Sequence, residues 1–238
     1  MSFSNGLLVS FFCVMSSMLM GCPNSMTVQM ESSSNCVPGP GVSGTPKNIE
    51  EAVTLINSLP KPVTVECFVE SLDRPLKVAL TNSEASAQPA AGTRSPRVFI
   101  FSDSLIISIV PDGRGSKVVE FSVLLSSDKS IKGEVPFPIQ GILDGKTPYD
   151  HIRDGNGTLC AACHGIEQQA PQITFTKAFI SKAFQPNWQT DVDLDNFRKE
   201  VLFCDPKVEP ERCRILEAIF GHGEVRKQDF PADMPAGS

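Results

Sequence analysis

The sequence has little of what a nucleic-acid-binding or membrane-spanning protein needs. Acidic residues (27) outnumber Lys and Arg (21), and the net charge of -6 argues against the basic face that binds nucleic acid. The uncharged apolar stretch at residues 6–20 covers 15 positions, which is too short for a comfortable membrane span. Histidine is scarce, and His151, His164 and His222 are the only three in the chain.

The start of the chain fits an export signal instead. Residues 6–20 are rich in Leu, Phe, Val and Met, which is typical of the apolar core of a secretory signal. No Lys or Arg precedes Lys47, so the usual basic region is missing. Either the signal is atypical or the start codon is misassigned.

The end of this signal carries a second feature. Leu19-Met20-Gly21-Cys22 resembles the lipobox of bacterial lipoproteins, in which the signal peptide is cleaved before the cysteine. The resemblance implies a signal peptide over 1–21, a lipid on Cys22 that holds the protein at a membrane, and a periplasm-facing place in the bacterial cell envelope. Pro23, where an inner-membrane retention signal would have Asp, favours the outer membrane. A plain leader followed by a chance cysteine is the alternative.

Every cysteine can be assigned a place or a bonded partner, so no unpaired thiol is expected in the exported protein. Of eight, one lies in the leader, Cys22 is the lipid candidate, and Cys160 and Cys163 belong to a motif discussed below. In an oxidising compartment the other four make two disulfides, most economically Cys36–Cys67 and Cys204–Cys213. Position in the chain suggests this pairing, but the spacing alone does not fix it.

Composition divides the chain into segments. Residues 22–46 are rich in Ser, Asn, Gly and Pro and are expected to form a flexible tether. Asn48 can cap a helix whose apolar residues recur at helical spacing until Pro60.

Strand-like runs then follow in a β-rich domain over 47–145. They lie at residues 63–69, 76–80, 97–101, 104–110, 117–125 and 134–139. Two prolines in the last run restrict it to a sheet edge. Six short strands predict an antiparallel sandwich or barrel, and the absence of histidine from it favours a binding or scaffolding role.

The residues most able to bind a cofactor lie in the remaining segment, 146–238. They form the motif Cys160-Ala161-Ala162-Cys163-His164. A c-type haem needs two thiols to add across its vinyl groups and one imidazole to bind its iron, and Cys-x-x-Cys-His supplies them on one helical turn. The sequence therefore predicts one covalent haem on Cys160 and Cys163, with His164 as the proximal iron ligand. A four-cysteine zinc site completed by Cys204 and Cys213, and a thioredoxin-like redox pair, are the competing interpretations.

The same segment resembles the class I cytochromes c. That family has Cys-x-x-Cys-His near its start and a distal methionine commonly followed by proline, and here Met234 precedes Pro235. The resemblance implies an all-α cytochrome domain over 146–238, with Met234 as the distal iron ligand and the carbonyl of Pro171 accepting the imidazole N–H.

The segment departs from the family after Met234. Only four residues follow it, so the family's C-terminal helix is absent or replaced by the helix expected at 209–220; another is expected at 191–203. His222 is the second candidate for the distal ligand, and His151 is interpreted as an exposed helix residue.

These features predict a lipid-anchored monohaem cytochrome c that relays single electrons between redox protein partners. An electron carrier is favoured over an enzyme, because no acid–base pair stands beside the motif as an oxidase or peroxidase would need. The alternative is a haem-bearing sensor or binding lipoprotein with five-coordinate iron, whose β-domain recognises a ligand.

Overall fold

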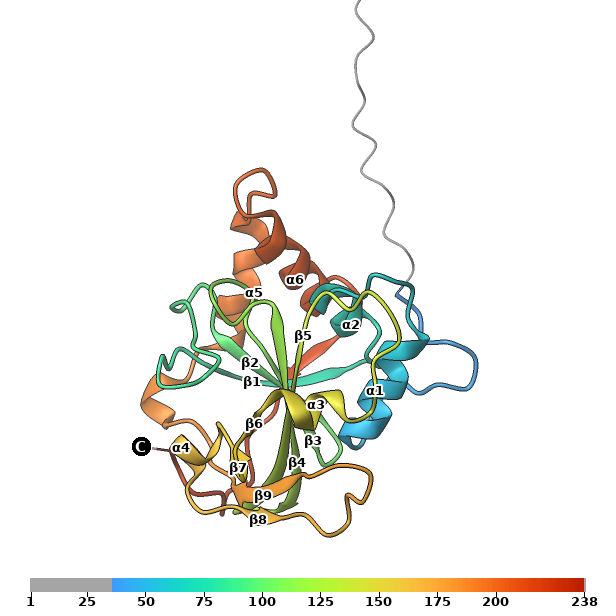
Figure 1. Ribbon diagram of the computed structural model, residues 1–238. Helices are drawn as coiled ribbons and strands as arrows, with labels where there is room; N and C mark the ends of the chain where they lie inside the picture. The colour runs from blue at the N-terminus through green and yellow to red at the C-terminus, as the bar shows by residue number, and fades with distance from the viewer. Residues whose placement is uncertain (1–35, 238) are drawn as a thin grey trace, which may run out of the picture. The chain divides into compact units, whose positions relative to one another are not determined.

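A computed structural model describes residues 36–237, which form one compact unit. The unit is built on one eight-stranded mixed sheet of order β10-β1-β2-β3-β4-β5-β9-β8 (Figure 1). Five consecutive strands form its antiparallel centre: β1 (Leu76–Thr81), β2 (Arg97–Ser102), β3 (Leu105–Ile109), β4 (Val118–Ser126) and β5 (Lys129–Pro136). The prediction of a sandwich or barrel is therefore wrong, although four of the six expected strands correspond to β1–β4.

The C-terminal part of the chain adds strands to this same sheet. β9 (Phe179–Lys182) pairs with β5, β8 (Gln168–Gln169) pairs with β9, and β10 (Val225–Lys227) lies parallel to β1. The prediction of an all-α cytochrome domain is therefore wrong, and the boundary expected near residue 145 falls inside the compact unit. The alternation of apolar and polar residues could not predict these strands, because each is only two to four residues long.

The first helix confirms its prediction. α1 (Ile49–Ser58) begins after Asn48, whose side chain accepts a hydrogen bond of 2.8 Å from the backbone N–H of Glu51. The helix packs against the sheet with α2 (Val65–Glu70) and α3 (Thr147–His151) on the same face. The apolar core of the unit consists of buried side chains from these elements and from the C-terminal helices, the largest being Tyr149, Phe68, Phe121, Phe197, Ile49, Leu55, Ile56, Ile100, Leu105, Ile107 and Ile109.

The strand expected at residues 63–69 is instead the helix α2. Thr64 caps it by accepting a hydrogen bond from the backbone N–H of Cys67, and Cys67 forms the predicted disulfide with Cys36. The helix buries Val65 and Val69 as well as Phe68, so it is apolar on most of its circumference. Over so few residues, a helix buried on several sides gives the same apolar pattern as a strand.

The strand expected at an edge, residues 134–139, is also corrected. β5 ends at Pro136 and lies inside the sheet, between β4 and β9. The proline is tolerated because β9 pairs only with the first three residues of β5, Lys129–Ile131, and leaves the proline end of the strand free of that partner.

Residues 36–46 do not form part of a tether. Cys36 is held by its disulfide, and the carbonyl of Pro46 accepts a hydrogen bond of 2.7 Å from the hydroxyl of Ser102. Residues 22–35 of the expected tether, the leader and Cys22 lie outside the described residues. Within residues 36–237, no helix has the length and apolar character to cross a bilayer.

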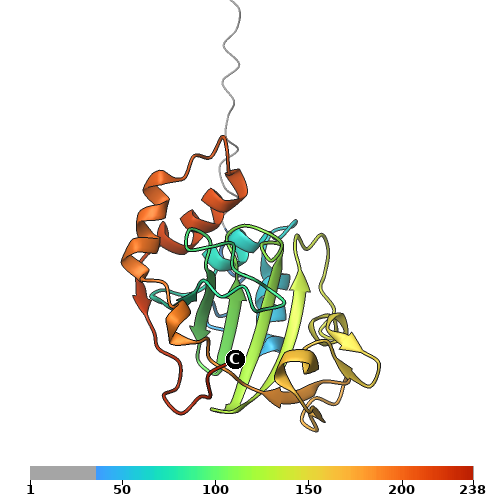
Figure 2. The same cartoon turned by 90° about the vertical axis from the view of Figure 1, so that its left-hand side faces the viewer.

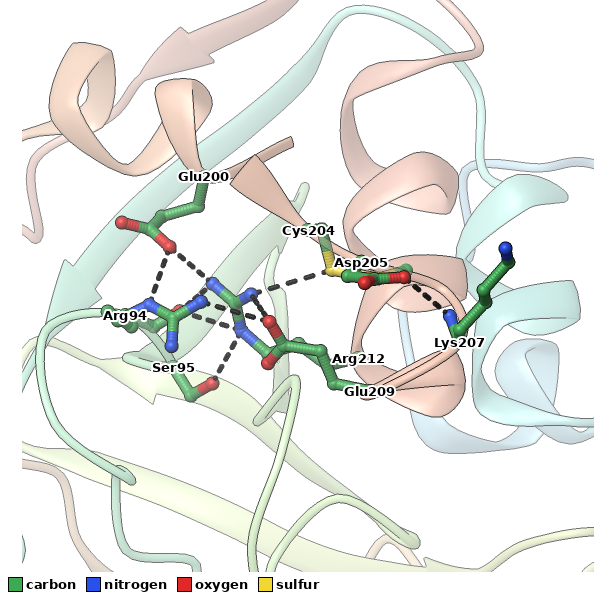
Figure 3. Close-up of polar contacts among 9 residues, drawn as sticks. Arg94, Ser95, Glu200, Cys204, Asp205, Lys207, Glu209 and Arg212 are labelled. Carbon is green, nitrogen blue, oxygen red and sulfur yellow. Dashed lines mark hydrogen bonds and ion pairs between the residues drawn. A yellow bond between two sulfur atoms is a disulfide. The ribbon is translucent and has the colours of Figure 1, made fainter. Parts of the chain in front are cut away.

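The two helices expected near the C-terminus form a hairpin, α5 (Leu194–Phe203) and α6 (Pro210–Phe220), which the predicted Cys204–Cys213 disulfide joins. Arg212 attaches this hairpin to the loop before β2 (Figure 3). Its guanidinium, only 2% exposed, donates to the carbonyl of Arg94 at 2.7 Å and to Glu200 at 2.7 Å, and lies 3.3 Å from Glu209.

Candidate haem attachment site

The three residues of the predicted haem motif lie on one helical turn. Cys160 precedes α4 (Ala161–His164), and its carbonyl accepts hydrogen bonds from the backbone N–H groups of Cys163 at 3.1 Å and His164 at 2.8 Å. Gly165, at φ 72°, ends the turn in a conformation that favours glycine. Both cysteines are free thiols, and at positions i and i+3 of one turn they are neighbours on its surface.

Hydrogen bonds that could not be predicted from the sequence hold this turn in place. The strands β6 (Arg153–Asp154) and β7 (Gly157–Thr158) form a short hairpin before it. The carboxylate of Glu167, beyond the motif, accepts a hydrogen bond of 2.7 Å from the backbone N–H of Thr158 and another from its hydroxyl. That hydroxyl in turn accepts from the backbone N–H of Cys160 at 3.1 Å. Glu167 therefore closes a loop around the motif.

The imidazole of His164 is oriented by the main chain of β9. Its Nδ1 lies 2.8 Å from the carbonyl oxygen of Lys182, and its ring stacks on Phe184 with 5.5 Å between centroids. Because a carbonyl only accepts hydrogen bonds, Nδ1 carries the proton and Nε2 keeps its lone pair. Burial lowers the pKa of His164 to about 4, so the ring is neutral near pH 7. This is the form that binds a metal ion.

The acceptor of this bond differs from the expected one. The resemblance to class I cytochromes c assigned it to the carbonyl of Pro171, and the structure assigns it to Lys182. The bond itself is the kind of outer contact that orients a ligating histidine. A backbone carbonyl eighteen residues downstream leaves no side-chain signal, so the sequence could not locate it.

The surroundings of the motif favour a large apolar group. Leu159, just before the first cysteine, is 64% exposed, and Ile166, just after the histidine, is 89% exposed. Cys163 between them is exposed as well. An apolar ring system bonded to the two cysteines has apolar side chains on both sides of the motif to contact. The residues present therefore fit a covalently held haem.

The C-terminal segment, whose residues include the expected distal ligand Met234, lies on the same sheet face as α4, opposite α1 and α2 (Figure 1 and Figure 2). Phe230 of this segment packs edge-on against Phe99 of β2, with ring centroids 5.1 Å apart. Gln185 then fixes the segment, since its backbone N–H donates to the carbonyl of Pro235 at 2.9 Å and its side chain donates to the carbonyl of Met234. The Met234 side chain is 3% exposed.

The other two histidines contact carboxylates elsewhere. His222 lies 3.8 Å from Glu70 of α2, and His151, at the end of α3, lies 3.1 Å from Glu134 of β5. His151 is 41% exposed, in agreement with its interpretation as a surface helix residue. The structure therefore gives each of these two histidines a carboxylate partner.

Two competing interpretations of the motif meet contrary observations. The zinc site needs Cys204 and Cys213 as thiolates, and these two sulfurs form a disulfide. A thioredoxin-like pair needs a cysteine whose pKa is lowered, whereas burial raises the pKa of Cys160. The helix that follows Cys160 also has only four residues.

The chain was compared with protein-family models, curated proteins and solved structures. None of them matches it.

Proposed function

We propose that this protein is an exported c-type cytochrome that carries one haem and transfers single electrons. The observation that carries the proposal is the pairing of two free thiols, Cys160 and Cys163, with an adjacent histidine whose Nδ1–H is held by the Lys182 carbonyl. Histidines that bind metal almost always donate their other ring N–H in this way, and a surface Cys-x-x-Cys-His formed by chance has no need of such a bond.

Each residue of the site has a separate task. The two thiols would hold the haem by adding across its two vinyl groups, each forming a thioether bond, and Nε2 of His164 would bind the iron. The Lys182 carbonyl and Phe184 fix the plane of the imidazole, and Glu167 holds the loop that carries the first thiol. The bound haem supplies an iron that takes up and releases one electron.

We also propose that Met234 is the second residue that would hold the iron. Its side chain is buried, and the side chain of Gln185 donates a hydrogen bond to its carbonyl. A methionine that held the iron together with His164 would favour electron transfer over ligand sensing or catalysis.

The proposed location rests on the disulfides and the leader. Two disulfides are characteristic of an oxidising compartment, where c-type haem attachment also takes place. The lipid on Cys22, the periplasm-facing envelope location and the redox protein partners remain part of this proposal.

Haem staining after denaturing electrophoresis tests the attachment. The chain is produced in a host with haem-maturation machinery, and covalent haem is expected to remain with the band. Cys160→Ala together with Cys163→Ala removes the stain, whereas the matched pair Cys204→Ser and Cys213→Ser retains it, because that disulfide lies in the α5–α6 hairpin. An unstained wild-type chain would overturn the proposal.

Carbon monoxide tests the second axial ligand. With Met234 on the iron, the reduced protein binds carbon monoxide slowly or not at all, and Met234→Leu, which keeps the buried volume without the sulfur, binds it rapidly. Rapid binding by the wild type supports the sensor with five-coordinate iron instead. Identical behaviour of the two proteins means that another residue holds the position.

A further inference from the structure

The ammonium group of Lys132 lies beside the hydrogen bond between His164 and the Lys182 carbonyl. Lys132 of β5 is half-buried, and its ammonium donates to the hydroxyls of Ser130 at 2.6 Å and Ser181 at 3.0 Å. It also donates to the carbonyl oxygen of Lys182 at 3.0 Å. All three partners are uncharged oxygens, so these contacts hold the ammonium in place without neutralising it.

The Lys182 carbonyl is therefore shared by a cation and a candidate iron ligand. The same oxygen accepts from Nδ1 of His164 at 2.8 Å, and a carbonyl has two lone pairs with which to accept both bonds. Because bonds of 3.0 and 2.8 Å meet at one atom, Nζ of Lys132 lies within about 6 Å of Nδ1. The ammonium is a near neighbour of the imidazole, at a distance fixed by β5 and β9.

Other charges around Lys132 reduce its effect without cancelling it. Glu120 of β4 and Glu167 of the motif loop attract the ammonium, while Arg97 of β2 repels it. Glu120 is itself paired with Arg97. Burial lowers the pKa of Lys132 to about 8, so the side chain is mainly protonated at pH 7.

We propose that Lys132 is a positioning residue that raises the reduction potential of the iron bound by His164. The inference rests on the proposed function. Two effects act in the same direction. The oxidised iron carries one more positive charge than the reduced iron, so a nearby cation favours the reduced form. The ammonium also withdraws electron density from the Lys182 carbonyl, which becomes a weaker acceptor and leaves the imidazole a weaker donor to the metal.

Substitution of Lys132 tests the proposal through the potential itself. Lys132→Met keeps the length of the side chain and removes its charge, and the midpoint potential of the attached haem, measured by spectroelectrochemical titration, is expected to fall. At an effective dielectric constant of about 20, the loss of a unit charge this close changes the equilibrium constant for reduction on the order of tenfold, about 59 mV for one electron. Lys132→Arg keeps the charge and is expected to stay close to the wild type.

The matched control is Lys129→Met, which removes the same charge from an exposed position on the same strand. It is expected to leave the potential nearly unchanged, because solvent and salt screen that position. A second readout is the iron–imidazole stretching frequency of the reduced protein in a form where the distal ligand is absent, such as Met234→Leu. We expect Lys132→Met to raise it, since the Nδ1–H bond strengthens.

The outcomes separate this inference from the proposed function. A wild-type chain without attached haem overturns both. A Lys132→Met protein that carries haem at the wild-type potential overturns the role of Lys132 and leaves the attachment standing. If Lys132→Met and Lys132→Gln both fail to attach haem while Lys132→Arg succeeds, the lysine is a structural residue and the inference is wrong.

Discussion

The buried Arg212 gives a sharp prediction about what holds the α5–α6 hairpin to the sheet. Arg212→Met keeps most of the apolar stem and removes the guanidinium, which is 2% exposed and bonded to Glu200 and to the carbonyl of Arg94. Removing one partner from a buried ion pair costs about 3–5 kcal/mol. Glu200 and Glu209 keep 20% and 23% of their side-chain surface exposed, so water compensates in part and a loss of about 3 kcal/mol is expected.

Thermal and urea unfolding followed by circular dichroism measure this loss. In a domain of this size 1 kcal/mol corresponds to about 2–4 °C, so the melting temperature is expected to fall by roughly 6–12 °C. The matched control is Arg94→Met, because Arg94 pairs with the same two carboxylates at 3.0 Å but is 57% exposed (Figure 3). Its removal is expected to change stability little. Equal losses in the two variants would refute the assignment of the stabilisation to burial.

Three further predictions concern stability. Removing Cys36–Cys67, which closes a 31-residue separation, is expected to cost about 1 kcal/mol more than removing Cys204–Cys213, which closes 9, as urea unfolding of the two double serine variants will show. Tyr149→Phe breaks the 2.7 Å bond from the hydroxyl to Glu50 and is expected to cost about 1.5–3 kcal/mol at pH 7; a loss near zero would mean that the bond is not formed in solution. Burial raises the pKa of Glu134 in the folded protein above its value in the unfolded chain. The stability that the protonated carboxyl group contributes is therefore fully present below the unfolded-state pKa and is lost as the pH rises through the folded-state pKa. Glu134→Gln is therefore expected to be the more stable protein at pH 7.5 and to lose that advantage at pH 4, and a lower stability at pH 7.5 would contradict the sign.

Local signals predicted the elements that depend on local interactions. The cap at Asn48 and the helical period after it located α1, and alternation located β1 to β4, because each pattern reflects the neighbouring residues of one element. The Cys-x-x-Cys-His turn was predictable for the same reason. Its geometry is set within five residues, and the structure closes it by bonds to the carbonyl of Cys160.

Elements that depend on distant partners were not predictable in this way. α2 is short, and besides its local cap at Thr64 it is held by its disulfide to Cys36 and its packing on α6. β9 has four residues and pairs with three residues of β5, so it is too short to show the alternation of apolar and polar residues that predicts a strand. The all-α expectation came from the haem motif, and the motif specifies one turn of helix and nothing about the fold around it.

In the site that we propose, a mixed sheet rather than an all-α domain holds the haem-binding turn. A haem-binding turn needs a fixed acceptor for the histidine, and a carbonyl in a paired strand is fixed by its ladder. Here β9 supplies that acceptor at Lys182, and three residues later Gln185 binds the segment that carries Met234. One short stretch of chain therefore sets the position of both proposed ligands. Because β5 holds β9 in register and also carries Lys132, the same strand pair that builds the site places a charge beside it.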